Sequence, residues 1–235
     1  MAVMPDAAHF KPHGFFVTGT DTGVGKTLIA CALLHAFAAT GRRVVGMKPV
    51  AAGVELSGGV PVNADVRMLR SSSNIEAAPA LVNPYCFERP IAPHIAAEQA
   101  GITIDPVHIR RAYAQLVQVA DVVIVEGAGG FCVPLNRHED TAHLARYLGL
   151  PVIMVVGLRL GCLNHALLTA QAIRASGLRL AGWIANRIDP AMPVAAENTR
   201  ALAERLAAPL LGTIDFTTAP DPARIAALLD LSTLA

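Results

Sequence analysis

The stretch from Gly19 to Thr27 holds residue types that bind phosphate and magnesium. It reads Gly-Thr-Asp-Thr-Gly-Val-Gly-Lys-Thr, follows an apolar run rich in Phe and Val, and leads into an Ala/Leu-rich segment. A buried strand, a glycine turn and a helix start are the context that a phosphate-binding loop needs. The glycines let backbone N–H groups point at a phosphate, with the helix dipole behind them. We therefore expect Lys26 on the outer phosphates and the Thr27 hydroxyl on Mg²⁺.

The spacing of this loop is unusual. The common pattern G-x-x-x-x-G-K-[ST] requires a glycine at the position of Thr20, so the loop is a variant. The alternative is a Gly-Lys-Thr that arose by chance at a helix N-terminus, with Lys26 as a surface lysine.

Two further charged residues follow predicted strands. Lys48 comes directly after the apolar segment 43–47, and Glu126 comes after four β-branched residues and before Gly127. The carboxyl ends of parallel strands are where ligands bind, so Lys48 is expected at the same edge as the phosphate loop. An acidic residue at the end of a buried strand has the form of a Walker B segment, which holds magnesium. The alternatives are a lysine in an ordinary loop and a carboxylate at the edge of the core.

The residues alone do not decide between two interpretations at two other sites. Asn63 is a good N-cap for a helix that runs to Arg70, and Asp65 in its first turn is either a metal ligand or a partner of the helix dipole. The segment 157–165 carries glycines into the start of a helix that ends at Ser176, which makes it a second potential anion site. The alternative there is that Asn164 only caps the helix.

Alternating strands and helices position these residues. Strands are predicted at 15–18, 43–47, 121–126, 151–156, 180–185 and 209–214, and helices at 26–40, 63–70, 105–120, 141–148, 165–176, 193–207 and 222–229. Because the strands are continuous apolar runs, we predict a single doubly wound, mostly parallel α/β sheet with helices on both faces. Residues 51–62 and 71–101 are predicted to be irregular chain, residues 1–13 a disordered leader, and residues 14–235 the folded domain.

The bulk properties exclude several classes of protein. A net charge of +1 gives no reason to expect nucleic acid or a membrane surface as a partner. Hydrophobic residues make up 53% of the chain, but no apolar run reaches the roughly 20 residues that span a bilayer. The N-terminus lacks the pattern of a signal peptide, so we expect a cytoplasmic protein with four buried, reduced cysteines. His138 and His143 are five residues apart rather than four, which argues against zinc.

Taken together, the motifs resemble the dethiobiotin synthetase family. They follow the family's order over residues 14–214: Phe16 to Thr27, Lys48-Pro49-Val50-Ala51, Asn83-Pro84-Tyr85, Pro93-His94, Val125 to Gly130, Gly161 to Ala166 and Ala181 to Asn186. The resemblance implies a P-loop NTPase-like fold and explains the unusual loop spacing, because the family shares Gly-Thr-Asp-Thr ahead of Val-Gly-Lys-Thr. It implies that 7,8-diaminononanoate, CO₂ and MgATP give dethiobiotin, ADP and phosphate.

The resemblance also implies a mechanism. One amine takes up CO₂ as a carbamate, the carbamate oxygen attacks the γ-phosphate, and the second amine closes the ureido ring on the mixed anhydride. Because two anions must meet, the site must supply positive charge, which Lys26, Lys48 and Mg²⁺ would provide. Phosphoryl transfer then needs no covalent protein nucleophile.

Roles for further residues follow from the same resemblance. Catalysis is assigned to Lys48 and Lys26, and magnesium to Thr27, Asp65 and Glu126. ATP binding is assigned to Gly23, Val24, Gly25, Lys26, Thr27, Leu28, Asp65, Glu126, Gly127, Ala128, Gly129, Asn186, Arg187, Asp215, Phe216 and Thr217. Substrate binding is assigned to Thr22, Lys48, Ala52, Gly161, Cys162, Leu163 and Asn164. Asn186 resembles the residue that reads the adenine edge, Ala52 stands where the family often has Ser, and 161–164 are implied to act across a homodimer interface.

Two rival classes deserve comparison. A MinD/ParA-like switch ATPase carries a signature lysine early in the loop, whereas this chain has Asp21 at that position. An amidoligase related to cobyrinate synthesis usually carries a glutaminase domain, for which 235 residues leave no room.

Overall fold

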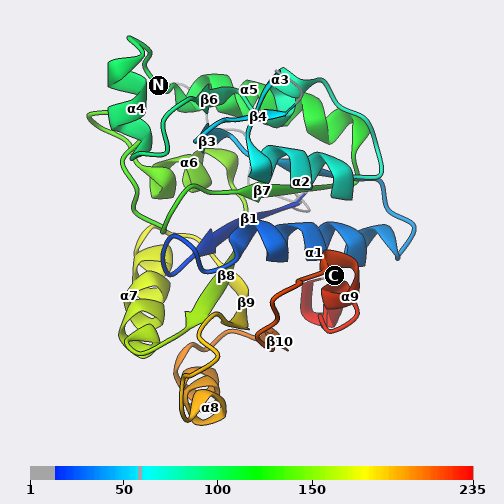
Figure 1. Cartoon of the computed structure of the whole chain (residues 1–235), viewed down its shortest axis with the longest axis vertical. Helices are drawn as coiled ribbons and strands as arrows, with labels where there is room; N and C mark the ends of the chain where they lie inside the picture. The colour runs from blue at the N-terminus through cyan, green and yellow to red at the C-terminus, as the bar shows by residue number, and fades with distance from the viewer. Residues whose placement is uncertain (1–13, 58–59, 235) are drawn as a thin grey trace, which may run out of the picture.

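The computed structural model describes residues 14–57 and 60–234 (Figure 1). Six strands form one sheet in the order β10-β9-β8-β1-β7-β2, and every neighbouring pair is parallel. The strands are β1 Gly14–Gly19, β2 Val44–Met47, β7 Val122–Glu126, β8 Val152–Leu158, β9 Leu180–Arg187 and β10 Leu210–Ile214. The predicted doubly wound α/β sheet is confirmed, and the predicted leader 1–13 lies outside the described residues.

Two apolar cores cover the two faces of the sheet. On β1, Phe16 packs into one core while Phe15 and Val17 pack into the other, as the alternation of side chains along a strand requires. One face is covered by α1 Lys26–Ala38, α2 Ala64–Ser72, α9 Pro222–Ala226 and the 3₁₀ turn Ser232–Leu234. The opposite core involves α3 Pro79–Val82, α4 Pro93–Gln99, α5 Pro106–Val119, α6 Thr141–Leu148, α7 Cys162–Ala175 and α8 Ala195–Arg205. Figure 1 shows α1 and α9 below the plane of β1 and β7, with α3 and α5 above it.

Capping residues fix where two helices begin, as predicted. The Asn63 side chain accepts a hydrogen bond of 3.2 Å from the backbone N–H of Val66 at the start of α2. Asp105 accepts one of 2.8 Å from Val107 at the start of α5, where proline occupies the first turn. The Asn63 cap fixes the start of α2, so that Asp65 lies in the first turn of this helix.

The prediction of irregular chain at 51–62 and 71–101 is wrong in part. The first segment contributes β3 Val50–Ala52, β4 Glu55–Ser57 and β5 Val60–Val62, and the second contains α3, β6 Tyr85–Phe87 and α4. β3 pairs in parallel with β6, and β4 pairs antiparallel with β5. Strands of three residues are too short to show periodicity, and the partner strand of β3 and of β6 lies far along the chain.

The prediction that all four cysteines are buried is also wrong. Cys31 and Cys162 are buried, whereas Cys86 and Cys132 are exposed, and all four are free thiols. Cys86 lies on the short β6 and Cys132 in the loop after β7, where no periodic pattern indicated which way the side chains face.

Among the described residues, none of the helices combines the length and the apolar character that a membrane span requires.

Candidate active site

The phosphate loop joins β1 to α1 at the carboxyl edge of the sheet. Gly25 is the N-cap of α1 with φ of 89°, and Gly23 has φ of 74°. Both values lie in the left-handed region that glycine adopts readily. A Cβ on Gly25 would lie 2.3 Å from Nδ2 of Asn186, so the loop also needs a glycine there for space. No side chain caps α1, which leaves its first N–H groups available to an anion.

A buried cluster of charges lies beside this loop. The ammonium Nζ of Lys48 is 2.5 Å from Oε1 of Glu126 and 2.9 Å from Oδ2 of Asp65. The Thr27 hydroxyl donates a hydrogen bond of 2.8 Å to the same Glu126 oxygen. Glu126 is 1% exposed and Lys48 is 5% exposed. Residues from α1, β7, α2 and the end of β2 therefore meet at one point, and Asp65 is more than a partner of the helix dipole.

Backbone contacts hold Lys48 in this position. Its N–H donates to the carbonyl of Val82 at 2.8 Å, and its carbonyl accepts from Nδ2 of Asn83 at 2.6 Å. The backbone of Lys48 is thereby fixed against α3 and the start of β6, two elements that the sequence did not predict. Only the four-carbon stem and the ammonium are left to move.

The second lysine of the cleft makes a different contact. Nζ of Lys26 donates a hydrogen bond of 2.9 Å to the backbone carbonyl of Asp21, inside the phosphate loop. The Asp21 carboxylate accepts from the N–H of Thr22 at 2.7 Å and forms an ion pair with Arg159, just after β8. Arg159 lies in the segment 157–165 that the sequence analysis named as a potential anion site, but its pairing with Asp21 was not predicted.

The charged side chains of this cluster and burial together shift the pKa values of Lys48, Asp65 and Lys26. Burial disfavours the charged form of Lys48, but the carboxylates of Glu126 and Asp65 outweigh it and raise the pKa of Lys48. Burial would raise the pKa of Asp65, but Lys48 holds it below its usual value of 3.8. Burial, assisted by the like charge of Lys48, lowers the pKa of Lys26 from 10.5 to about 8. Lys48 is therefore a cation throughout the physiological range.

A cleft of about 830 Å³ opens over these residues. Most of the residues assigned to the phosphates, the metal and the substrate line it: Thr22, Gly23, Gly25, Lys26, Thr27, Lys48, Ala52, Asp65, Glu126, Ala128 and Gly129. Val24 is buried beneath the loop. The cleft is also lined by residues to which the sequence analysis gave no role: Asp21, Val50, residues 90–93, Gly130 and Val133. Residues 90–92 precede α4 and Pro93 begins it, within the segment that was predicted to be irregular.

The donors at the floor of the cleft fit a magnesium ion. Hydroxyl and carboxylate oxygens of Thr27, Asp65 and Glu126 are the hard ligands that Mg²⁺ prefers. Oε2 of Glu126 is buried and has no hydrogen-bond partner among the described residues. No cluster of three or more His, Cys, Asp or Glu side chains with metal-binding geometry occurs in the described part of the chain. A metal here would therefore need further oxygens, which the phosphates of a nucleotide supply.

The remaining predicted residues lie outside the cleft of one chain. Asn186 is 5% exposed and donates from Nδ2 to the carbonyl of Val24 at 2.8 Å. Because Ile214 pairs with Asn186 in the sheet, the exposed segment 215–217 begins beside Asn186 and Arg187. The segment 161–164 forms the start of α7, where Gly161 rather than Asn164 is the N-cap, so the alternative that Asn164 caps this helix is wrong.

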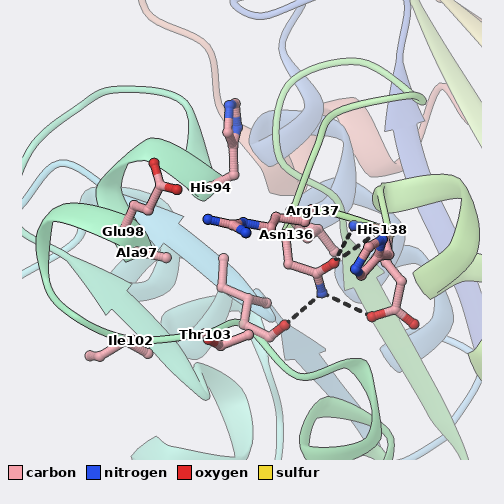
Figure 2. Close-up of a pocket in the computed structure, with 11 residues that line it drawn as sticks. His94, Ala97, Glu98, Ile102, Thr103, Asn136, Arg137 and His138 are labelled. Carbon is pink, nitrogen blue, oxygen red and sulfur yellow. Dashed lines mark hydrogen bonds between the residues drawn. The ribbon is translucent and has the colours of Figure 1, made fainter.

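A second hollow of about 520 Å³ lies between α4 and the loop before α6 (Figure 2). Nδ2 of Asn136 donates to the carbonyl of Ile104 at 3.0 Å and to Oε2 of Glu139 at 2.9 Å, which joins its two walls. His138 lines this hollow, while Nδ1 of His143 lies 2.8 Å from Oδ1 of Asp140 at the start of α6. The two histidines thus face different surroundings.

The parallel sheet, the glycine loop at the start of α1 and the acidic residue that ends β7 define a P-loop NTPase-like α/β protein. A family model described as an AAA domain matches residues 13–224. Solved structures with this fold include the septum site-determining protein MinD of Pyrococcus horikoshii, with TM-score 0.53 and 19% identity over 92% of this chain and 85% of that chain. The signal recognition particle receptor FtsY of Elizabethkingia anophelis has TM-score 0.51 and 17% identity, and the match covers 95% of this chain and 67% of that chain. These likenesses establish the fold alone.

Sequence relatives define the family. The ATP-dependent dethiobiotin synthetase BioD of Nitrosospira multiformis is 59% identical over 93% of this chain and 95% of its own length. The protein of the same name from Aromatoleum aromaticum is 57% identical over 94% of this chain and 98% of its own length. The protein of that name from Janthinobacterium sp. is 53% identical over 93% of this chain and 94% of its own length. The chain belongs to the family of ATP-dependent dethiobiotin synthetases, and it is an enzyme of the ligase class.

Proposed function

We propose that this enzyme closes the ureido ring of dethiobiotin from 7,8-diaminononanoate, CO₂ and ATP. One amine adds to CO₂ and loses a proton, which gives a carbamate. A carbamate oxygen attacks the γ-phosphate and ADP leaves. The second amine then attacks the carbamate carbon, the C–O bond to the phosphoryl group breaks, and phosphate leaves as the ring closes.

The observation that carries this proposal is the convergence of Lys26, Lys48 and Glu126 in one cleft. A carbamate and a triphosphate repel each other, so their reaction needs fixed positive charge where they meet. Lys48 is charged at neutral pH and lies at the cleft floor, and Lys26 lies in the loop that would wrap the phosphates. The Lys26 ammonium is held by a backbone carbonyl of the loop, and the backbone of Lys48 is fixed beside the cleft, so both charges stay near the place where the anions would meet.

Magnesium fits the same site. Thr27, Asp65 and Glu126 would hold it, and when bound it would offset charge on the β- and γ-phosphates. The N–H groups from Gly23 to Leu28 would bind the phosphates, while Gly127, Ala128 and Gly129 allow a ligand to approach the backbone. Asn186, Arg187 and the segment 215–217 would contact the base. Thr22 and the backbone at Ala52 would contact the substrate.

A homodimer would complete the substrate site. Residues 161–164 do not line the cleft of their own chain, so any contact with substrate in such a cleft would come from a partner. Leu160 is 96% exposed and Leu168 on α7 is 55% exposed, which supports an interface at this helix. We expect Leu160→Asp to convert the dimer to monomer in light scattering. Leu228→Asp is the matched control, because Leu228 is also exposed, at 57%, but follows α9.

Phosphate release with one component omitted at a time tests the reaction. We expect release only when ATP, magnesium, the diamine and bicarbonate are all present, with one phosphate for each dethiobiotin formed. ATP hydrolysis that ignores the diamine would contradict a synthetase and favour a switch ATPase of the MinD type.

Lys48→Ala tests the role of the buried lysine. Because Lys48 meets the carbamate rather than the base or the phosphate loop, we expect a severe loss of turnover with a smaller loss of ATP affinity. Unchanged turnover would make Lys48 an ordinary loop lysine.

A further inference from the structure

The Lys48 ammonium lies where two metal-binding carboxylates meet. It is 2.5 Å from Glu126 and 2.9 Å from Asp65, which are the two acidic residues that fit magnesium. Two carboxylates that converge in a buried site repel each other unless a cation lies between them. In the described structure that cation is the ammonium of Lys48.

We propose that Lys48 holds the place of the divalent cation in the nucleotide-free enzyme, and that the metal arriving with the nucleotide releases Lys48 toward the carbamate. This inference rests on the function proposed above and adds an order of events to it. Before the nucleotide binds, the acidic oxygens are engaged by Lys48. Afterwards the same ammonium is free for the substrate.

The three partners differ in their freedom to move. The Glu126 side chain is 1% exposed and its Oε1 also accepts from Thr27, so it is anchored. The Asp65 side chain is 40% exposed at the first turn of α2, so it can rotate toward a metal. The backbone of Lys48 is fixed on both sides, whereas its flexible stem can swing the ammonium. Release therefore needs side-chain rotation only, and Nζ already donates a long hydrogen bond of 3.5 Å to the carbonyl of Gly127.

The order of events follows from electrostatics. A divalent cation bound by Glu126 and Asp65 would face the Lys48 ammonium at close range, and like charges in a buried site repel strongly. Without a nucleotide, the metal gains only these side chains and must displace an ammonium that is already paired with Oε1 of Glu126 and Oδ2 of Asp65. With a nucleotide, phosphate oxygens add ligands for the metal, and the displaced ammonium gains an anionic partner.

Lys26 provides a matched comparison. It is also a lysine of the cleft, 7% exposed, but its Nζ contacts the carbonyl of Asp21 rather than a carboxylate. Removing either lysine deletes one positive charge from the cleft. Only removal of Lys48 takes away the ammonium that directly contacts the two carboxylates.

Binding of Mn²⁺ to the nucleotide-free protein tests the inference. Free Mn²⁺ is measured by electron paramagnetic resonance with the wild type, Lys48→Met and Lys26→Met, and folding is checked by circular dichroism. We expect Lys48→Met to bind one Mn²⁺ per chain at least about tenfold more tightly than the wild type, and Lys26→Met to show a clearly smaller gain, because Lys26 acts on the carboxylates only at a distance. A second change, Glu126→Gln, should abolish the gain. No gain in folded Lys48→Met, or an equal gain in Lys26→Met, would overturn the inference.

A measurement on the unaltered enzyme covers the case in which Lys48→Met does not fold. In a crystal structure of the wild type with magnesium and ADP, we expect Nζ of Lys48 to lie beyond hydrogen-bonding distance of Asp65. An ammonium still bonded to Asp65 beside a bound metal would overturn the inference. Neither measurement uses the diamine, so failure to form dethiobiotin would overturn the proposed function alone.

Discussion

The side-chain amide of Asn186 donates a hydrogen bond of 2.8 Å to the backbone carbonyl of Val24 in the phosphate loop. This bond joins the end of β9 to the loop after β1, although β8 separates the two strands in the sheet. The same amide lies where a side chain on Gly25 would project. Asn186 therefore supports the phosphate loop from beneath.

Asn186→Ala should weaken both the loop and the fold. A buried carbonyl that loses its donor costs about 1–3 kcal/mol. We expect the free energy of unfolding to fall by about that amount and ATP affinity to fall by about tenfold, measured by urea denaturation and calorimetry. The control is Asn198→Ala on α8, whose amide donates to the carbonyl of Val194 at an exposed site. Unchanged ATP affinity in Asn186→Ala would argue against a supporting role.

Gly25→Ala should abolish nucleotide binding while the fold remains. The new Cβ would meet the Asn186 amide at 2.3 Å, on a backbone with φ of 89°. Gly23→Ala introduces similar backbone strain, with φ of 74°, but no atom lies within 4 Å of its Cβ. We expect calorimetry to detect a much larger loss of ATP affinity for Gly25→Ala than for Gly23→Ala. Equal losses would show that strain rather than space sets the requirement for glycine.

The exposed pair of Arg43 and Asp121 should make stability depend on pH in the acid range. Hydrogen bonds from Arg43 hold the pKa of Asp121 at about 2, below its usual 3.8. A carboxyl with a depressed pKa stabilises the fold above pH 3.8, and this contribution is lost as the pH falls toward 2. Asp121→Asn should lower the melting temperature by about a degree or two at pH 7, because exposed pairs contribute little.

The difference in melting temperature between the wild type and Asp121→Asn should become smaller below pH 4, as measured by thermal melts. Glu204→Gln is the control, since its contact with Arg205 is 3.4 Å long and exposed. A difference that stays constant from pH 7 to pH 3 would contradict the role given to Asp121.

The four cysteines should separate into two classes. Cys31 and Cys162 are 0% and 3% exposed, and burial raises the pKa of Cys31 to about 11. Cys86 and Cys132 are exposed, and desolvation raises the pKa of both. Because the thiolate is the reactive form, a disulfide reagent should modify two thiols per native chain, faster at pH 9 than at pH 7. Modification of all four before unfolding would contradict the burial of Cys31 and Cys162.

The sequence predicts most of the fold because its six long strands are apolar runs punctuated by glycine loops and capped helices. It does not predict β3 and β6, because each has three residues and depends on a partner about 35 positions away for its hydrogen bonds. Asn83 lies between α3 and β6, and its amide donates to the carbonyl of Lys48. The support of a predicted site residue thus came from a segment predicted to be irregular.

The candidate site, too, could be predicted from the sequence only in part. Lys26, Lys48 and Glu126 could be predicted to share an edge, because each follows a strand of one parallel sheet. The direct contact of Lys48 with both carboxylates could not be predicted, because it depends on how α2 packs against β2. The ion pair of Asp21 with Arg159 was missed because 138 residues separate the two side chains.

Transfer of oxygen from bicarbonate to phosphate tests the central claim most directly. If a carbamate oxygen attacks the γ-phosphate, that oxygen must leave with the phosphate when the ring closes. A single turnover with ¹⁸O-labelled bicarbonate, quenched before the label exchanges with water, should give phosphate that carries one ¹⁸O, detected by mass spectrometry. Phosphate without label, formed together with dethiobiotin, would contradict the account.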